Sequence, residues 1–213
     1  MSNHPKKQFR IQNKTNLYID GTNLFAGQNE LFGPNRYLSF PYFLKEIRNI
    51  LKIDKIFFYA SYMSESNRTR LDKGRQNLIS AEALFYREVR NTKGLIFYKG
   101  HRSPTSGKEK GVDVHLSVDI VNDVFLGRCN KVVILTGDAD LIYPLEIVKM
   151  LKIPTVALFL PNRFSLEMSY KADTAFVLNF LNKFKVEEVN RKLPKDLKVI
   201  SIKKPRMINI RGK

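Results

Sequence analysis

The chain has 213 residues, 43% of them hydrophobic, and it carries a formal net charge of +17. A chain of this length and composition can bury a core of its own, so we expect one globular domain with or without tails. No apolar run approaches the roughly 20 residues of a membrane helix, and no apolar segment follows the basic N-terminus. These features exclude a membrane-spanning protein, and the single cysteine excludes an internal disulfide. We therefore expect a cytoplasmic protein without a membrane partner.

The positive charge is concentrated at the two ends of the chain. Residues 1–14 hold four Lys/Arg and no acid, and residues 183–213 hold eleven Lys/Arg against three acids. We expect a basic flexible N-terminus over residues 1–13, a folded domain over residues 14–182, and a basic C-terminal tail after it. Such charge either keeps a protein soluble or binds a polyanion, most often nucleic acid, and we favour the second explanation.

Five short apolar or β-branched runs predict β-strands. They cover residues 15–19, 55–62, 95–98, 132–135 and 154–160. A segment rich in Gly, Asn and Pro predicts a loop from the first strand to about Phe40, and composition predicts a second loop over residues 100–111.

Helical spacing of apolar residues predicts helices between and after these strands. They cover residues 41–51, about 67–91, 113–127, a stretch through Leu145, Val148 and Leu151, and about 175–184. In the third of them, Val114, Val118, Val121 and Phe125 form the apolar stripe of an amphipathic helix. Strands that alternate with helices indicate an α/β fold, with a parallel sheet covered on both faces.

Four carboxylates come where predicted strands end or where the next helix begins. They are Asp20 after the first strand, Asp113 after the third, and Asp138 and Asp140 after the fourth. Because the carboxyl ends of parallel strands meet at one edge of a sheet, we expect these side chains to converge in one cleft. Converging acids repel one another, and a hard cation such as Mg²⁺ or Mn²⁺ relieves that repulsion. No His/Cys cluster accompanies them, so the predicted site is not a zinc site.

Each acid also has a purely structural interpretation. Asp20 would belong to a plain turn, whereas Asp113, Asp138 or Asp140 would cap the helix that follows it. Asp119 either joins the other acids or lies on a solvated helix face. The presence of the first four at one edge of the sheet favours the metal site over these separate explanations.

Three sequence motifs follow one another along the chain. They are Tyr18-Ile19-Asp20-Gly21-Thr22-Asn23, Lys110-Gly111-Val112-Asp113-Val114-His115-Leu116-Ser117-Val118-Asp119 and Leu135-Thr136-Gly137-Asp138-Ala139-Asp140-Leu141. Over roughly residues 14–182, their order and spacing resemble the NYN domain, a branch of the PIN-like nuclease superfamily, and are most similar to its LabA-like group. The resemblance implies a three-layer α/β/α sandwich with a five-stranded parallel sheet in the order 3-2-1-4-5. In that order the ligand crevice opens between the first and fourth strands.

The same resemblance implies Mg²⁺- or Mn²⁺-dependent hydrolysis of RNA phosphodiester bonds, and we expect endonucleolytic cleavage. The metal positions of the family match Asp20, Asp113 and Asp138 and, less closely, Asp140 and Asp119. The expected catalytic residues are Asp20, Asp113, Asp138, Asp140, Asn23 and Thr136. Asn23 and Thr136 would orient water or phosphate as uncharged partners.

Basic residues after the second and third strands are expected to bind the substrate, which would be single-stranded or structured RNA. They are Arg68, Arg70, Arg75, Arg102, Lys108 and Lys110. Phe25, Tyr37 and Tyr62 would stack on bases or pack within their loops. The sequence leaves self-association into a homo-oligomer open.

Two other functions are compatible with parts of the pattern. A haloacid-dehalogenase-type phosphatase shares the Asp-Gly-Thr and Gly-Asp strings, but Tyr18 stands where its nucleophile is usual. A non-catalytic RNA-binding module with a PIN-like fold is the stronger alternative. A binding protein gains nothing from four acids beside a polyanion, so we favour the nuclease.

Overall fold

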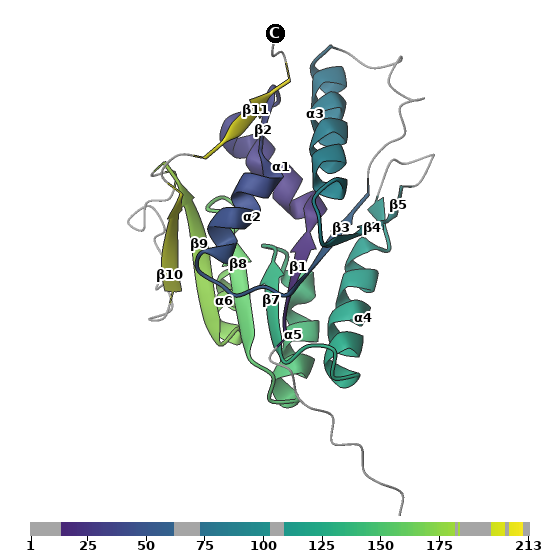
Figure 1. Cartoon of the computed structure of the whole chain (residues 1–213), viewed down its shortest axis with the longest axis vertical. Helices are drawn as coiled ribbons and strands as arrows, with labels where there is room; N and C mark the ends of the chain where they lie inside the picture. Colours follow the sequence, from purple (N-terminus) through teal and green to yellow (C-terminus); the bar gives the residue numbers. More distant parts are fainter. Residues whose placement is uncertain are drawn as a thin grey trace, which may run out of the picture.

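The computed structural model describes residues 14–61, 73–102, 109–181, 183, 197–202 and 205–210. Its centre is a seven-stranded parallel sheet in the order β10-β9-β8-β7-β1-β3-β4 (Figure 1). The strands are β1 (Thr15–Asp20), β3 (Lys55–Ala60), β4 (Leu95–Lys99), β7 (Lys131–Leu135), β8 (Thr155–Phe159), β9 (Thr174–Phe180) and β10 (Leu197–Ile202). Two short pairs complete the strands: β2 (Arg36–Leu38) with β11 (Met207–Asn209), and β5 (His101–Arg102) with β6 (Glu109–Lys110).

Helices cover both faces of the sheet (Figure 1). One layer contains α1 (Gly21–Phe32), α2 (Phe40–Arg48) and α3 (Lys73–Arg90), and the other contains α4 (Val112–Phe125), α5 (Ile142–Met150) and α6 (Leu166–Lys171). The first core lies between the sheet and α1–α3, and the second core lies between the sheet and α4–α6. Successive strand residues point to opposite faces, so in β1 Leu17 and Ile19 belong to the first core and Tyr18 to the second. The predicted α/β class, with a parallel sheet between helices, is confirmed.

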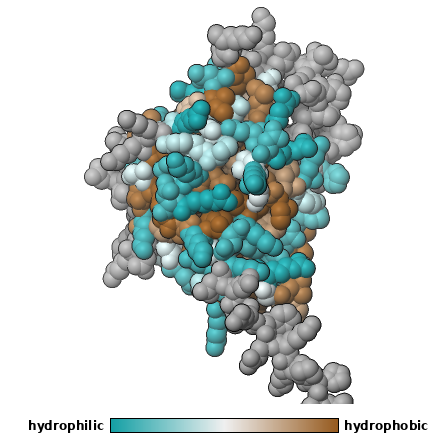
Figure 2. All heavy atoms as spheres, viewed as in Figure 1, coloured by the Kyte–Doolittle hydropathy of each residue, from teal (hydrophilic) through white to brown (hydrophobic). Residues whose placement is uncertain are grey.

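Hydrophilic residues cover much of the face seen in Figure 1, and hydrophobic residues show between them near the middle of the molecule (Figure 2). Within the described ranges, no helix combines the length and the apolar character that crossing a membrane requires.

The prediction of a five-stranded sheet is wrong, because the sheet continues past β8 with β9 and β10. The helix predicted at residues 175–184 is strand β9 instead. Ala175 and Val177 point into one core, while Phe176, Leu178 and Phe180 point into the other. A strand buried on both faces is apolar throughout, so it lacks the alternation that would have distinguished it from a helix.

The C-terminal extension contributes one strand to the seven-stranded sheet and one to the short pair with β2. Strand β10 pairs with β9 along its whole length, and its Ile200 and Ile202 are buried in the first core. Strand β11 pairs with β2 in antiparallel fashion. Segments expected to lie in a basic tail therefore complete the domain.

Helix α1 occupies most of the segment for which composition predicted a loop. Its glycines allow close packing rather than a turn. A Cβ atom on Gly21 would lie 2.1 Å from a ring carbon of Phe58, and one on Gly27 would lie 2.5 Å from a methyl carbon of Leu160. Glycine lowers helix propensity, so the sequence signal was weak where the packing requirement is strong.

The face of α4 that packs against the sheet is not the one that its apolar stripe predicted. Val114, Val118 and Phe125 are 65%, 57% and 78% exposed. The helix instead buries the face that carries Val112, Leu116, Ile120 and Val124. Both faces are apolar, and periodicity alone does not decide between them.

Candidate active site

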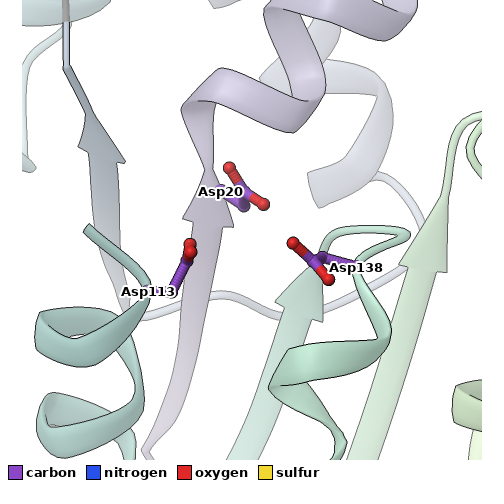
Figure 3. A group of neighbouring side chains, drawn as sticks. All are labelled: Asp20, Asp113 and Asp138. Carbon is purple, nitrogen blue, oxygen red and sulfur yellow. The ribbon is translucent and has the colours of Figure 1, made fainter. Parts of the chain in front are cut away.

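Three aspartates from three different elements meet at the carboxyl edge of the sheet (Figure 3). Asp20 ends β1, Asp138 follows β7, and Asp113 lies in the first turn of α4. Each offers one carboxylate oxygen, and these three oxygens all lie within 4.8 Å of one another. Because β1 and β7 are neighbours in the sheet, the first and third motifs of the sequence are adjacent in space.

Asp20 is the N-cap of α1, and hydrogen bonds fix its carboxylate. The backbone N–H of Asn23 donates to Oδ1 over 2.9 Å, and the Thr136 hydroxyl donates to Oδ2 over 2.8 Å. The residue is 3% exposed. The turn interpretation is therefore replaced by a capping role, which holds the Asp20 carboxylate in place at the carboxyl edge of the sheet.

Thr136 connects two of the acids. Its Oγ1 donates to Asp20 and accepts from the backbone N–H of Asp138 over 3.1 Å. Asp138 in turn caps the 3₁₀ turn at Ala139–Leu141, where its Oδ1 accepts from the backbone N–H of Asp140 over 3.0 Å. Thr136 is fully buried, so its hydroxyl holds both acids without access to solvent.

Asn23 stabilises the loop after β7. Its side-chain carbonyl accepts from the backbone N–H of Gly137 over 3.1 Å. A Cβ atom on Gly137 would lie 2.1 Å from the carbonyl oxygen of Arg163, so only glycine fits between Thr136 and Asp138. The arginine was not predicted as part of the site, because it belongs to no motif. Its guanidinium pairs with Glu30 on α1, and its Nε is buried without a partner among the described residues.

Asp113 completes the group without capping its helix, because Gly111 is the N-cap of α4. Burial, followed by repulsion from Asp138 and Asp140, raises the pKa of the Asp113 carboxyl. The three acids together with Asp140 therefore form a site of unfavourable negative charge, which a cation would stabilise.

The donor set fits a hard divalent cation. Oxygens bound to one Mg²⁺ at about 2.1 Å lie roughly 3 to 4 Å apart in octahedral geometry. The limit of 4.8 Å between the carboxylate oxygens requires only a small adjustment of the side chains. Oxygen-only ligands favour Mg²⁺ or Mn²⁺ over zinc.

Asp119 and Asp140 lie outside this group of three. Asp119 is half-buried one and a half turns further along α4, and its Oδ2 accepts from the Tyr59 hydroxyl over 2.8 Å. Burial and this hydrogen bond raise the pKa of Tyr59. Asp140 is exposed, yet it is close enough to raise the pKa of Asp113.

The NYN domain family model matches residues 14–179, which is more than half of the chain. The chain belongs to the NYN domain family. NYN domains have a PIN-like nuclease fold, and the three motifs of the sequence lie within the matched range. The comparison with curated proteins gives no match.

A crystal structure of a protein of unknown function from Vibrio parahaemolyticus is similar in fold to this NYN domain. The TM-score is 0.56 at 14% sequence identity, over 80% of this chain and 95% of that chain. At this level of identity the similarity shows the fold alone.

The side chains of all six predicted substrate-binding bases lie outside what the structure describes. Arg68, Arg70 and Lys108 lie outside the described residues, and only the backbones of Arg75, Arg102 and Lys110 are described, in α3, β5 and β6.

Two of the three aromatic candidates for base stacking do not line the site. Phe25 and Tyr37 are 7% and 6% exposed and belong to the first core, so the stacking interpretation is wrong for both. Tyr62 lies outside the described residues. Tyr18 is also fully buried, and its hydroxyl donates to Asp123 over 2.8 Å, so it does not face the acids as a phosphatase nucleophile would.

Proposed function

We propose that this NYN protein is a metal-dependent ribonuclease that hydrolyses RNA phosphodiester bonds, by endonucleolytic cleavage, with Mg²⁺ or Mn²⁺ as its cofactor. The observation that carries the proposal is the convergence of Asp20, Asp113 and Asp138 from three elements. The motifs also support a place in the LabA-like group of the family.

The metal would be held by these three aspartates. When bound, a divalent cation lowers the pKa of a coordinated water and neutralises charge on the phosphate. The Thr136 hydroxyl orients the carboxylate of Asp20 and holds the backbone of Asp138, whose own carboxylate is oriented by the backbone N–H of Asp140. Asn23 fixes the loop that carries Asp138 through the Gly137 peptide, so its role is to position the site rather than to react.

RNA as the substrate is supported by the charge of the chain and by its family. The protein has 37 Lys/Arg against 20 Asp/Glu, which favours a polyanion partner. The acids alone would repel a phosphate, so a site of this kind binds nucleic acid productively only with a cation present. This electrostatic argument distinguishes a nuclease from a simple RNA-binding module.

The proposal is tested by cleavage of a labelled single-stranded RNA in Mn²⁺ or Mg²⁺, with single-stranded DNA of the same sequence alongside. Asp20→Asn and Asp138→Asn should each lower the rate by at least about 100-fold, because each removes a charged ligand. Glu146→Gln is the matched control, because it also removes one negative charge but comes from an α5 residue that pairs with Lys171. RNA binding without metal-dependent cleavage by the folded wild type would instead establish the non-catalytic module.

A further inference from the structure

An apolar groove lies between α4 and α5, on the outer side of the helix layer. Its volume is about 600 Å³. Val118, Val121 and Phe125 line it from α4, and Tyr143 and Ile147 line it from α5. Asp140 lies at the end of the groove that is nearest the carboxyl edge of the sheet, beside the acids of the candidate active site. The groove therefore leads from the carboxyl edge of the sheet toward the far end of α4.

The groove leaves large apolar side chains in contact with water. Phe125 is 78% exposed, Tyr143 is 69% exposed and Val118 is 57% exposed. Contiguous exposed apolar surface of this kind marks a place where another segment binds. Among the described residues, no Lys or Arg lines the groove, so a nucleic acid strand would find no partner for its phosphates there.

The described chain begins beside the loop that follows α4. The backbone N–H of Lys14 donates to the side-chain oxygen of Asn130 over 2.9 Å, and the Asn130 N–H donates to the Lys14 carbonyl over 2.9 Å. Asn130 follows the C-terminal end of α4, which carries Phe125. Residues 1–13 are therefore attached near the C-terminal end of α4, the end at which Phe125 lines the groove.

The N-terminal segment has the length and the residue types that the groove requires. Thirteen extended residues span up to about 45 Å, whereas α4 from Phe125 to Asp113 spans roughly 18 Å. The segment carries Phe9 and Ile11, three Lys/Arg and no acid. Going from Lys14 toward the N-terminus, the segment has Ile11 and Phe9 first and Lys7 and Lys6 after them. The groove shows the matching order, with apolar side chains near Phe125 and the acid Asp140 at its other end.

We propose that residues 1–13 bind extended in the groove between α4 and α5. Phe9 and Ile11 cover Phe125 and Val118, and the basic residues Lys6 and Lys7 lie toward Asp140. The segment thereby shields the apolar face of α4 and brings positive charge to the edge of the acidic site. This inference does not depend on ribonuclease activity, because it concerns the groove and not the chemistry.

A single tryptophan tests the proposal, because the natural chain has none. Tyr143→Trp in the full-length chain places a fluorescent reporter in the groove. The double variant Phe9→Ser/Ile11→Ser should then increase acrylamide quenching of that tryptophan at least about two-fold and shift its emission to the red, because the apolar cover is lost. The polar pair Gln8→Ser/Gln12→Ser is the matched control and should change neither property. Tyr170→Trp, on α6 outside the groove, should not respond to either double variant.

Three results would overturn the proposal. Equal quenching of the Tyr143→Trp reporter with and without Phe9 and Ile11 would show that the segment does not cover the groove. Quenching that falls as protein concentration rises, together with a doubled mass in light scattering, would identify a second copy as the occupant. Protection of the reporter only after RNA is added would assign the groove to the substrate.

Discussion

At the scale of single residues, one hydroxyl organises the candidate site. Thr136 donates to Asp20 and accepts from the peptide of Asp138, so the relative position of the two acids depends on it. The sequence placed Thr136 in a motif and predicted a role in orienting water or phosphate. The structure shows contacts to the two acids, which are the contacts expected of a residue that positions metal ligands.

Thr136→Val should therefore weaken Mn²⁺ binding by about 10-fold or more while the fold persists, because loss of a hydrogen bond behind a metal ligand typically costs this much. Isothermal titration with Mn²⁺ measures the effect. Thr136→Ser is the matched control, because it keeps the hydroxyl, and it should bind nearly as the wild type does. Equal affinity in Thr136→Val and the wild type would show that this hydroxyl does not position the ligands.

The raised pKa of Asp113 predicts a pH-dependent stability. Burial, with repulsion from Asp138 and Asp140, raises this pKa in the folded state above the value of about 3.9 in an unfolded chain. The folded protein then binds the proton more tightly, so the contribution of the carboxyl is full below pH of about 3.9 and is lost as the pH rises through the folded pKa. In metal-free protein, Asp113→Asn should leave Tm nearly unchanged near pH of about 3.5 and raise it by about 1 to 3 °C near neutral pH. A difference in Tm that stays constant with pH would contradict this assignment.

The residues of the site were predictable to different degrees. Asp20, Asp113 and Asp138 stand in motifs at strand or helix ends, so topology alone brought them to one edge. Arg163 comes from the loop after β8 and touches the site through its backbone, a contact that no residue type signals. Asp119 is directed by a hydrogen bond from Tyr59, which sequence spacing does not reveal.

At the scale of elements, the strands that alternate with helices were predictable and the C-terminal part was not. Apolar runs predicted β1, β3, β4, β7 and β8 to within a few residues, because each is bounded by turn residues. Strand β10 has a mixed pattern, LKVISI, in which only Ile200 and Ile202 are buried. Its place in the sheet depends on pairing with β9, which is a long-range contact.

Truncation after residue 196 should lower the free energy of unfolding and promote aggregation. The truncation removes β10 and β11, uncovers the edge of β9, and exposes core side chains next to Ile200 and Ile202. Burial of two isoleucines is worth about 3 to 6 kcal/mol, so chemical denaturation should detect the loss easily. Unchanged stability and a monomeric truncated protein would show that β10 is dispensable.

At the scale of the whole molecule, a strongly basic chain carries an acidic site. Because the C-terminal extension contains strands, its part in RNA binding is best tested by changing charge and not by deletion. Arg191→Gln/Lys192→Gln/Lys195→Gln should weaken RNA binding and reduce the slope of log affinity against log salt by up to about 2. Fluorescence anisotropy over a range of salt concentrations measures the slope. The same slope in the triple variant would show that these bases serve another partner.

The distribution of charge also explains why the metal is central to the account. Asp20, Asp113 and Asp138 lie together on a strongly basic chain, and burial and repulsion from Asp138 and Asp140 already disfavour the charge of Asp113. A divalent cation would relieve the repulsion among the acids, because they attract it. It would also relieve the repulsion between the acids and a phosphate, because it attracts the phosphate in turn.

The most direct measurement is the rate of RNA cleavage by one purified sample of the full chain, first treated with a chelator and then resupplied with Mn²⁺. The account predicts that cleavage stops on chelation, returns with Mn²⁺, and does not return in Asp138→Asn. Cleavage that persists in the chelator, or that returns equally in Asp138→Asn, would contradict the assignment of the three aspartates as the metal site of a ribonuclease.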